Sequence, residues 1–362
     1  MTKHKVFRFF RTLHAWGGVS LALLLLLSSV SGSVLVWKNE WVKLSLGETD
    51  VAFSATPQAL ASIAQAVEAQ FDSNDIYQIQ FPTQDFPFAK VTLADSRYAY
   101  LDTHGNILDQ WVQNERWEEW LYDLHHRLLL ENTGLVIVGF SGMAMILLLV
   151  AGVIAFWPLR RGLRLGFWPK SAARASLQIT HRNIGIIEAL PLLLTLVTGV
   201  LLAFPDKSLQ LLLEPFRDDD YSLDFAENLD TITGADSGSW LQVMERSLAS
   251  FPDANIRTAQ VPNDNSPYRI IGLQQSGSLH PLGLSKVYIE AYGGWMDIRI
   301  DDQAQHVSER LYNLSYPLHT GTFDNVYYKI LLTISGILVA ILSTLGLVSF
   351  IKQFSKTTST PG

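Results

Sequence analysis

The chain has 362 residues, of which 48% are hydrophobic, and a formal net charge of -7 at pH 7. Its mean hydropathy of +0.17 is too high for one ordinary soluble domain and too low for a chain that lies wholly in a membrane, so we expect both kinds of segment. The basic clusters are short and flank apolar runs, which disfavours a nucleic-acid-binding protein. The sequence has no cysteine, which excludes disulfides, thiolate iron–sulfur ligation and haem attachment through a CxxCH motif.

Four long apolar runs predict membrane-spanning helices, at about Trp16–Trp37, Leu135–Trp157, Ile184–Phe204 and Ile330–Ile351. Such a helix needs about 20 predominantly apolar residues. The first run follows a basic start, as in a signal peptide. However, it is longer than the usual apolar region of a signal peptide, and no convincing small-residue cleavage site follows it. We therefore predict that it is a retained helix.

The basic residues predict how these helices are oriented. They cluster before the first run, between the second and third runs, and after the fourth, so the positive-inside rule places both termini and the middle loop in the cytoplasm. The predicted organisation is a cytoplasmic segment (1–15), a helix (16–37), an external domain (38–116), a helical lead-in and helix (117–157), a cytoplasmic loop (158–182), a helix (183–204), an external domain (205–318), a lead-in with the fourth helix (319–351) and a cytoplasmic tail (352–362).

An internal repeat divides the chain into two copies of helix, external domain and helix. The residues that recur at equal spacing are His14 and His181, Gly18 and Gly185, Gly32 and Gly199, His125 and His319, Ser141 and Ser335, and Gly152 and Gly346. Each external segment begins with a helical pattern and later contains a Tyr-acid-Gly hairpin, which starts at Tyr100 in one and Tyr288 in the other. The predicted fold is four transmembrane α-helices in two parallel repeats, with two small α+β external domains.

Four repeat-related histidines are the candidate ligands of a cofactor. Because the helices alternate in direction, His14 and His181 are expected near the cytoplasmic face, and His125 and His319 near the outer face. A hydrocarbon core about 30 Å thick separates the faces, so one pair per face is the natural arrangement. Two imidazoles on facing helices suit axial ligation of a planar macrocycle, and nearby glycines leave room for it. Zinc is disfavoured because a pair lacks the usual four ligands, whereas a role as interfacial polar residues stays open.

Other polar residues near these histidines are secondary candidates. His126 is one residue out of register with His319 and would point about 100° away, so we treat it as a neighbour or a reserve ligand. Arg11, Arg127 and Arg182 are candidates to pair with haem propionates, since guanidinium recognises carboxylate well. The equal alternative is that these arginines only set the topology or reach to the membrane interface.

An acidic residue inside the third apolar run is a further candidate. Glu188 lies seven residues after His181, on the same expected helix face, and Pro191 follows within a turn. Ionisable groups within membrane helices usually mark a functional site, so we assign Glu188 a candidate role with protons or a quinol. The remaining histidines fall in tails, turns or loops and are expected at the surface: His4, His104, His280 and His306.

Four short motifs give the chain a resemblance to a known family. They are LHAWGG from Leu13, LHHRLLL from Leu124, THRNIG from Thr180 and LHTG from Leu318. Together with the two Tyr-acid-Gly hairpins, they are similar to the PepSY-associated transmembrane helix family, and the resemblance covers nearly the whole chain. It implies a Gram-negative inner-membrane protein with PepSY-like domains in the periplasm and a link to iron uptake. Some members are ferric-siderophore reductases with two b-type haems, which implies ligation by His14 with His181 and by His125 with His319.

The expected function is therefore electron transfer through two b-type haems to a ferric chelate in the periplasm. The sequence has no flavin or nicotinamide fingerprint, so electrons would come from a quinol or a redox partner protein. The alternative is a non-redox membrane protein whose periplasmic domains bind or regulate another molecule. In that case the histidines would only pack.

Overall fold

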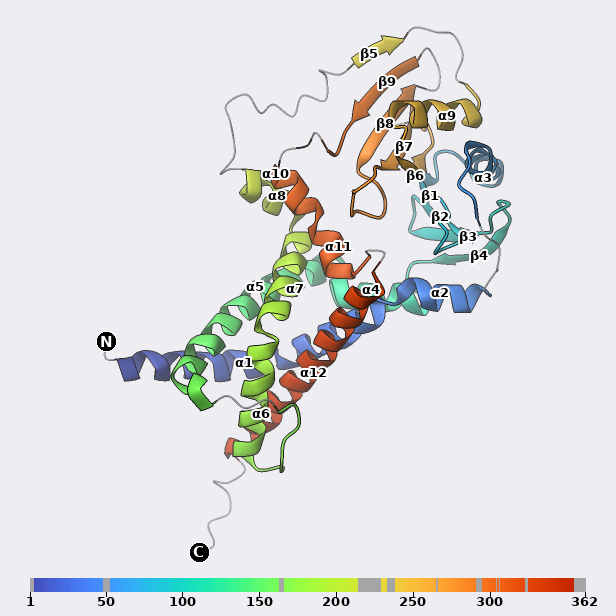
Figure 1. The fold of residues 1–362 in the computed structure, drawn as a ribbon. Coiled ribbons are helices and arrows are strands. Elements are labelled where there is room, and N and C mark those ends of the chain that lie inside the picture. Colours follow the sequence, from blue (N-terminus) through green and yellow to red (C-terminus); the bar gives the residue numbers. More distant parts are fainter. Residues whose placement is uncertain are drawn as a thin grey trace, which may run out of the picture. The chain divides into compact units, whose positions relative to one another are not determined.

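The computed structural model describes residues 3–47, 53–162, 166–213, 229–232, 238–264, 266–290, 295–303, 305, 307–322 and 325–354. The chain forms two compact units (Figure 1). We call Met1–Trp37, Leu121–Ser208 and Leu318–Gly362 the helical unit, and Lys38–Trp120 with Leu209–Pro317 the sheet unit. Each unit thus contains segments from both halves of the chain.

The helical unit is built on long apolar helices. Its helices are α1 (Lys3–Leu35), α5 (Glu131–Phe156), η1 (Trp157–Gly162), α6 (Arg174–Ile187), α7 (Ala189–Ala203) and α12 (Val326–Phe354). Three further helices lie partly within this unit: α4 (Trp117–Arg127), α8 (Pro205–Leu213) and α11 (Ser315–Thr320). Among the described residues, three stretches are long and apolar enough to cross a membrane: His4–Leu35, Glu131–Arg161 and Val326–Phe354. The pair α6 and α7, bent by 64°, passes the same test as one broken span, which would make four.

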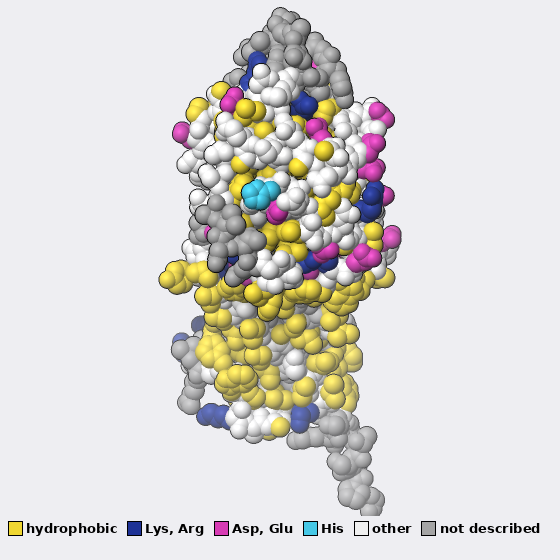
Figure 2. Space-filling view, turned by 90° about the vertical axis from the view of Figure 1, so that its right-hand side faces the viewer, with side chains coloured by type: hydrophobic (Ala, Val, Ile, Leu, Met, Phe, Trp, Pro, Cys, Tyr) yellow, Lys and Arg dark blue, Asp and Glu magenta, His cyan; other side chains and the backbone are white. Residues whose placement is uncertain are grey.

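The outer surface of these helices is apolar. Large hydrophobic side chains such as Leu23, Phe140, Leu147 and Ile337 are exposed along α1, α5 and α12. Figure 2 shows hydrophobic side chains covering the visible face of this part of the molecule. An exposed apolar belt on long helices is typical of contact with lipid.

The third predicted helix differs from the expectation of one segment over 183–204. It begins earlier, at Arg174, and is broken between Ile187 and Ala189. Pro191 has no backbone N–H, and its ring excludes the carbonyl of the residue four positions earlier, which is Ile187. The chain therefore bends at Glu188, although hydrogen bonds continue on either side, from Glu188 N to Ile184 O and from Leu192 N to Glu188 O.

A tight turn joins α4 to α5. Leu128, Leu129 and Glu131 have positive φ angles of 53°, 59° and 52°, a conformation that side chains other than glycine rarely adopt. A Cβ atom on Gly134 would lie 1.5 Å from the Arg127 carbonyl oxygen. Only glycine at this position lets the end of α4 lie directly against the first turn of α5.

Among the residues that the structure describes, the sheet unit contains one antiparallel sheet of nine strands in the order β4-β3-β2-β1-β6-β7-β8-β9-β5. The strands are β1 (Ile76–Gln80), β2 (Ala89–Leu93), β3 (Arg97–Leu101), β4 (Ile107–Val112), β5 (Leu229–Ile232), β6 (Asn255–Gln260), β7 (Tyr268–Gln274), β8 (Ser285–Glu290) and β9 (Trp295–Ile300). The helices are α2 (Lys38–Leu46), α3 (Pro57–Gln70), α9 (Trp240–Ser250) and α10 (Val307–Asn313). The predicted helices before Phe71 and Phe251 are α3 and α9.

The two external segments share this sheet rather than forming the two separate domains that we expected. β1 from the first segment pairs with β6 from the second, with Ile79 opposite Ala259 and Gln80 opposite Thr258. The helices α3 and α9 contribute to one hydrophobic core, and the Trp240 indole donates a hydrogen bond to Glu68 Oε2 at 2.7 Å. Each segment alone would leave a strand edge unpaired, and this pairing covers both edges.

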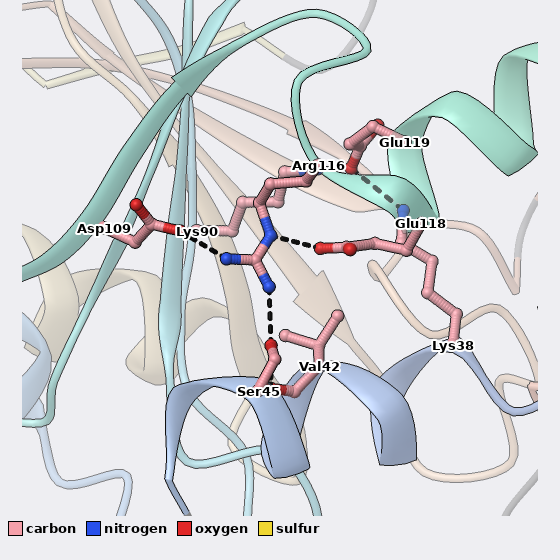
Figure 3. A network of polar contacts seen from close by, with 8 residues as sticks. All are labelled: Lys38, Val42, Ser45, Lys90, Asp109, Arg116, Glu118 and Glu119. Carbon is pink, nitrogen blue, oxygen red and sulfur yellow. Dashed lines mark hydrogen bonds and ion pairs between the residues drawn. The ribbon is translucent and has the colours of Figure 1, made fainter.

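A network of buried charges connects α2, β2 and the start of α4 within the sheet unit (Figure 3). Glu119 accepts hydrogen bonds from Lys38 at 3.0 Å and Lys90 at 2.9 Å. Burial raises the pKa of Glu119, but the two ammonium groups outweigh burial and lower the pKa to about 2. Next to it, Arg116 donates to Asp109, to Glu118 and, at 2.6 Å, to Ser45 Oγ.

Replacing Glu119 with glutamine is expected to destabilise the sheet unit because Lys38 and Lys90 lose their counter-charge. The pKa shift of Glu119 alone corresponds to about 3 kcal/mol. Burial lowers the pKa of Lys90, and this cost offsets part of the stabilisation by Glu119. We therefore expect the free energy of unfolding to decrease by about 2 kcal/mol at pH 7. Since the folded pKa is depressed, this stabilisation is present above the ordinary glutamate pKa and is lost as the pH falls toward about 2.

The measurement is the thermal unfolding of the full-length protein in detergent, followed by circular dichroism at pH 7 and pH 3. The difference in unfolding midpoint between wild type and Glu119→Gln should be large at pH 7 and roughly half as large at pH 3. The matched control is Asp95→Asn, which removes an exposed ion pair with Arg97 at 3.1 Å and should leave the midpoint unchanged. Equal midpoints for all three proteins would contradict the prediction.

Candidate functional site

The structure brings the four repeat-related histidines together as two pairs in the helical unit. His14 on α1 and His181 on α6 have ring centroids 5.9 Å apart, with planes inclined by 68°. His125 on α4 and His319 on α11 have centroids 6.0 Å apart, with planes inclined by 49°. Each pair thus joins one histidine from each half of the chain, in the combination expected from the repeat.

Backbone carbonyls set the proton positions of the first pair. His14 Nδ1 lies 2.9 Å from Leu148 O, and His181 Nδ1 lies 2.9 Å from Leu342 O. A carbonyl oxygen only accepts hydrogen bonds, so each Nδ1 carries the proton and donates it. In the neutral imidazole, the lone pair is therefore on Nε2, the nitrogen that is available to a metal ion.

Hydroxyl groups set the proton positions of the second pair, His125 and His319. His125 Nδ1 lies 3.0 Å from Ser31 Oγ, and this hydroxyl gives its own proton to Leu27 O at 2.7 Å. Ser31 therefore accepts from His125. Thr198 Oγ1 lies 3.1 Å from His319 Nδ1 and donates its own proton to a carbonyl of its own helix at 2.8 Å. All four histidines thus present Nε2 with a free lone pair.

Four glycines lie directly against the imidazole rings. A Cβ atom at these positions would come too close to a histidine Cε1, at 2.8 Å for Gly152 with His14, 3.1 Å for Gly346 with His181, 2.9 Å for Gly32 with His125 and 3.0 Å for Gly199 with His319. These glycines, which we expected to leave room for a flat macrocycle, also let the histidine rings lie close to the neighbouring helices. Open space lies at Gly18, one turn after His14, where a Cβ would meet no described atom within 4 Å.

The geometry of each pair fits a haem iron with two axial imidazoles. Metal–imidazole bonds are about 2 Å long. The ring centroid lies about 1 Å behind the nitrogen, so one iron between two imidazoles would hold the centroids about 6 Å apart. Among the residues that the structure describes, no group of three or more His, Cys, Asp or Glu side chains is placed to hold a metal ion. Two nitrogens are enough for axial haem ligation but fall short of a structural zinc site.

His126 lies outside both pairs. Its ring packs 5.3 Å from that of Tyr122, and its Nδ1 is buried without a hydrogen-bond partner among the described residues. Of the other histidines, His4 and His104 are exposed as expected, whereas His280 is half-buried with its ring 5.1 Å from that of Tyr316, and His306 lies outside the described residues.

The three candidate arginines differ in their surroundings. Arg127 is half-buried, and its Nε has no hydrogen-bond partner among the described residues. Arg182 donates to Asn183 Oδ1 through Nε at 3.2 Å and Nη2 at 3.0 Å. Arg11 is exposed. Arg127 therefore has the strongest need for an additional acceptor, such as a carboxylate.

Glu188 lies at the break between α6 and α7 and is 4% exposed. The Ser335 hydroxyl on α12 donates to its Oε2 at 2.6 Å. The sequence predicted a carboxyl group within one continuous helix, on the face of His181. The bend changes that expectation, because the helix axis turns at Glu188 itself.

The hydrogen-bond partners of the histidines were not among the predicted site residues. Ser31 and Thr198 follow His14 and His181 by the same number of residues, and Leu148 and Leu342 follow His125 and His319 in the same way. The repeat register therefore contained a signal for these four partners. The contacts themselves, from α1 to α5, from α6 to α12, from α4 to α1 and from α11 to α7, required the structure.

The long helices with exposed apolar surfaces define an integral membrane protein that carries two histidine pairs. A family model described as PepSY-associated TM region matches residues 11–353, nearly the entire chain. The chain belongs to this family, as its motifs predicted. No curated protein matches it.

Proposed function

We propose that this protein is a di-haem electron-transfer protein of the bacterial inner membrane that reduces a periplasmic ferric chelate. The proposal rests on one observation above all: four imidazoles in two pairs, each with its Nδ1 proton already donated and its centroid about 6 Å from that of its partner. Hydrogen bonds from Nδ1 to the protein are typical of histidines that bind a metal through Nε2, because they fix the ring orientation and raise the basicity of the ligand.

The two pairs would hold two b-type haems. His14 and His181 would bind one haem, His125 and His319 the other, and Arg127 is the leading candidate to pair with a propionate. Haem iron between two imidazoles supplies one-electron exchange between its ferric and ferrous states. The protein would hold two such centres at different depths, set their potentials through the donors at Nδ1, and exclude water with its apolar helices.

The direction of electron flow follows from the predicted topology. The positive-inside rule assigns the His14 and His181 pair to the cytoplasmic side and the His125 and His319 pair to the periplasmic side. Electrons would enter from a quinol or a redox partner and leave to a ferric siderophore or similar chelate. Reduction would weaken the hold of the chelate on iron and release the ferrous ion.

The proposal predicts two haems per chain in protein purified from haem-replete cells. The reduced-form absorbance bands should weaken by about half in His14→Ala and disappear in the double variant His14→Ala with His125→Ala, because each substitution removes one axial ligand. His126→Ala is the matched control, adjacent to a proposed ligand but outside both pairs, and should keep the full absorbance.

A colourless preparation would overturn the proposal. It would favour the alternative, a non-redox membrane protein whose sheet unit binds a periplasmic peptide or protein. In that case the four histidines would contribute only to packing, and the alanine variants would change thermal stability without any change in the visible spectrum.

A further inference from the structure

The carboxyl group of Glu188 is isolated within the helical unit. It is almost fully buried at the break between α6 and α7, and Ser335 is its one hydrogen-bond partner among the described residues. A carboxylate taken out of water normally requires a cation or several donors. Glu188 has a single neutral donor among the described residues, so a charge on it has few compensating contacts.

The described apolar stretches of α5, α7 and α12, which contact α6, carry no charged side chain. Neither α7 nor α5 after Glu131 contains a titratable residue, and α12 contains none from Ile330 to Ile351. On α6 the titratable residues nearest in sequence are His181 and Arg182, and the guanidinium of Arg182 is engaged by Asn183. Any change of charge within this apolar bundle would therefore act on Glu188 with little screening.

The repeat shows that the first half of the chain has no carboxyl group at the equivalent position. In the first half of the chain, the position equivalent to Glu188 is Leu21, and the position equivalent to Ser335 is Ser141. There α1 runs unbroken through Leu21. The serine is thus present in both halves, but only the second half places an ionisable group opposite it. The carboxyl group is thus confined to the half of the chain in which the helix is broken.

We propose that Glu188 is a proton-binding site that takes up a proton when an electron enters the helical unit. This inference rests on the di-haem function proposed above. An electron from the donor would add one negative charge to the helical unit, held by a haem bound at one of the histidine pairs. One proton from the aqueous phase binds the free carboxylate oxygen of Glu188, which becomes a neutral acid, so the two charges cancel. The Ser335 hydroxyl remains bonded to Oε2 throughout.

Such coupling is expected because a nearby negative charge raises the proton affinity of a carboxylate. The effect is largest where the medium is apolar and no cation competes. Membrane proteins commonly use intramembrane carboxyl groups as proton relays. Glu188 would thereby make the reduction of the protein dependent on pH.

The test is a redox titration of the full-length haem-loaded protein in detergent between pH 6 and pH 8. In wild type, the midpoint potential of one haem should fall as the pH rises, and in Glu188→Gln this slope should decrease at least twofold. Ser335→Ala should shift the pH range of the slope, because it removes the one donor to the carboxylate. Ser141→Ala is the matched control and should behave as wild type.

A second readout does not depend on haem. Infrared spectra recorded at a series of pH values should show the band of a protonated carboxyl group that is present in wild type, absent in Glu188→Gln and shifted in Ser335→Ala. Haem-loaded protein with the same pH slope in wild type and Glu188→Gln would overturn the coupling. A missing infrared band would overturn the proton site itself. Colourless protein with a titrating band would instead refute the di-haem proposal and retain the proton site.

Discussion

Replacing His319 with alanine is expected to abolish the reduction of a ferric chelate while one haem per chain remains bound. His319 pairs with His125 at a centroid distance of 6.0 Å, so its loss removes one of the two axial ligands of the proposed outer site. The pair of His14 and His181 has its own partners, Leu148 and Leu342, and is left intact. The measurement is chelate reduction by the purified protein supplied with a reductant, alongside its absorbance spectrum.

The informative comparison is between His319→Ala and Thr198→Val. The valine keeps the shape of the threonine but removes the hydroxyl that meets His319 Nδ1, while the Thr195 carbonyl at 3.1 Å can still accept from it. We expect Thr198→Val to keep both haems and to reduce activity only partly, by about tenfold, in line with the loss of an outer hydrogen bond to a metal ligand. Unchanged activity in His319→Ala would mean that the chelate is reduced elsewhere.

Replacing Gly152 with alanine is expected to weaken haem binding at the pair of His14 and His181 by at least tenfold. The added Cβ would lie 2.8 Å from His14 Cε1, so the ring must move and cannot keep its hydrogen bond to Leu148 O at the present length. A displaced ring would lose its orientation and its hydrogen bond to Leu148 O, and both losses weaken metal binding. Loss of haem on titration with a competing haem-binding protein measures the effect.

Gly18→Ala is the matched control for this substitution. Both glycines lie in long apolar helices, and alanine is the better helix former at each. A Cβ on Gly18 meets no described atom within 4 Å, so Gly18→Ala should bind haem as wild type does. Equal weakening in both variants would show that the effect comes from the helices rather than from the contact with His14.

The sequence was sufficient to predict the features that depend on periodicity. Long apolar runs predicted three helices that could each cross a membrane, whereas the third run forms the bent pair α6 and α7. The repeat register predicted that His14 lies with His181 and His125 with His319, because equal spacing in the two halves places equivalent side chains at equivalent depths. The helical patterns before Phe71 and Phe251 correctly predicted α3 and α9.

The periodicity of the sequence did not predict which segments far apart in the chain contact one another. The pairing of β1 with β6 joins strands from different halves, and no local pattern specifies which edge a strand will meet. The 64° bend between α6 and α7 and the partnership of Glu188 with Ser335 depend on how α12 packs beside the break. The close contact of Gly152 and Gly346 with imidazole rings was also not predicted.

The division of the histidines between the two halves has a consequence for how such a protein can be assembled. Each half of the chain supplies one histidine to each pair and one strand to the junction of β1 with β6. A half-length chain with these features would therefore hold only single histidines and an open sheet edge. Two copies related by a twofold axis would restore both, since an isologous contact matches each surface with itself. The full-length chain is thus organised like two linked copies of one half, although the halves differ at positions such as Glu188 and Leu21.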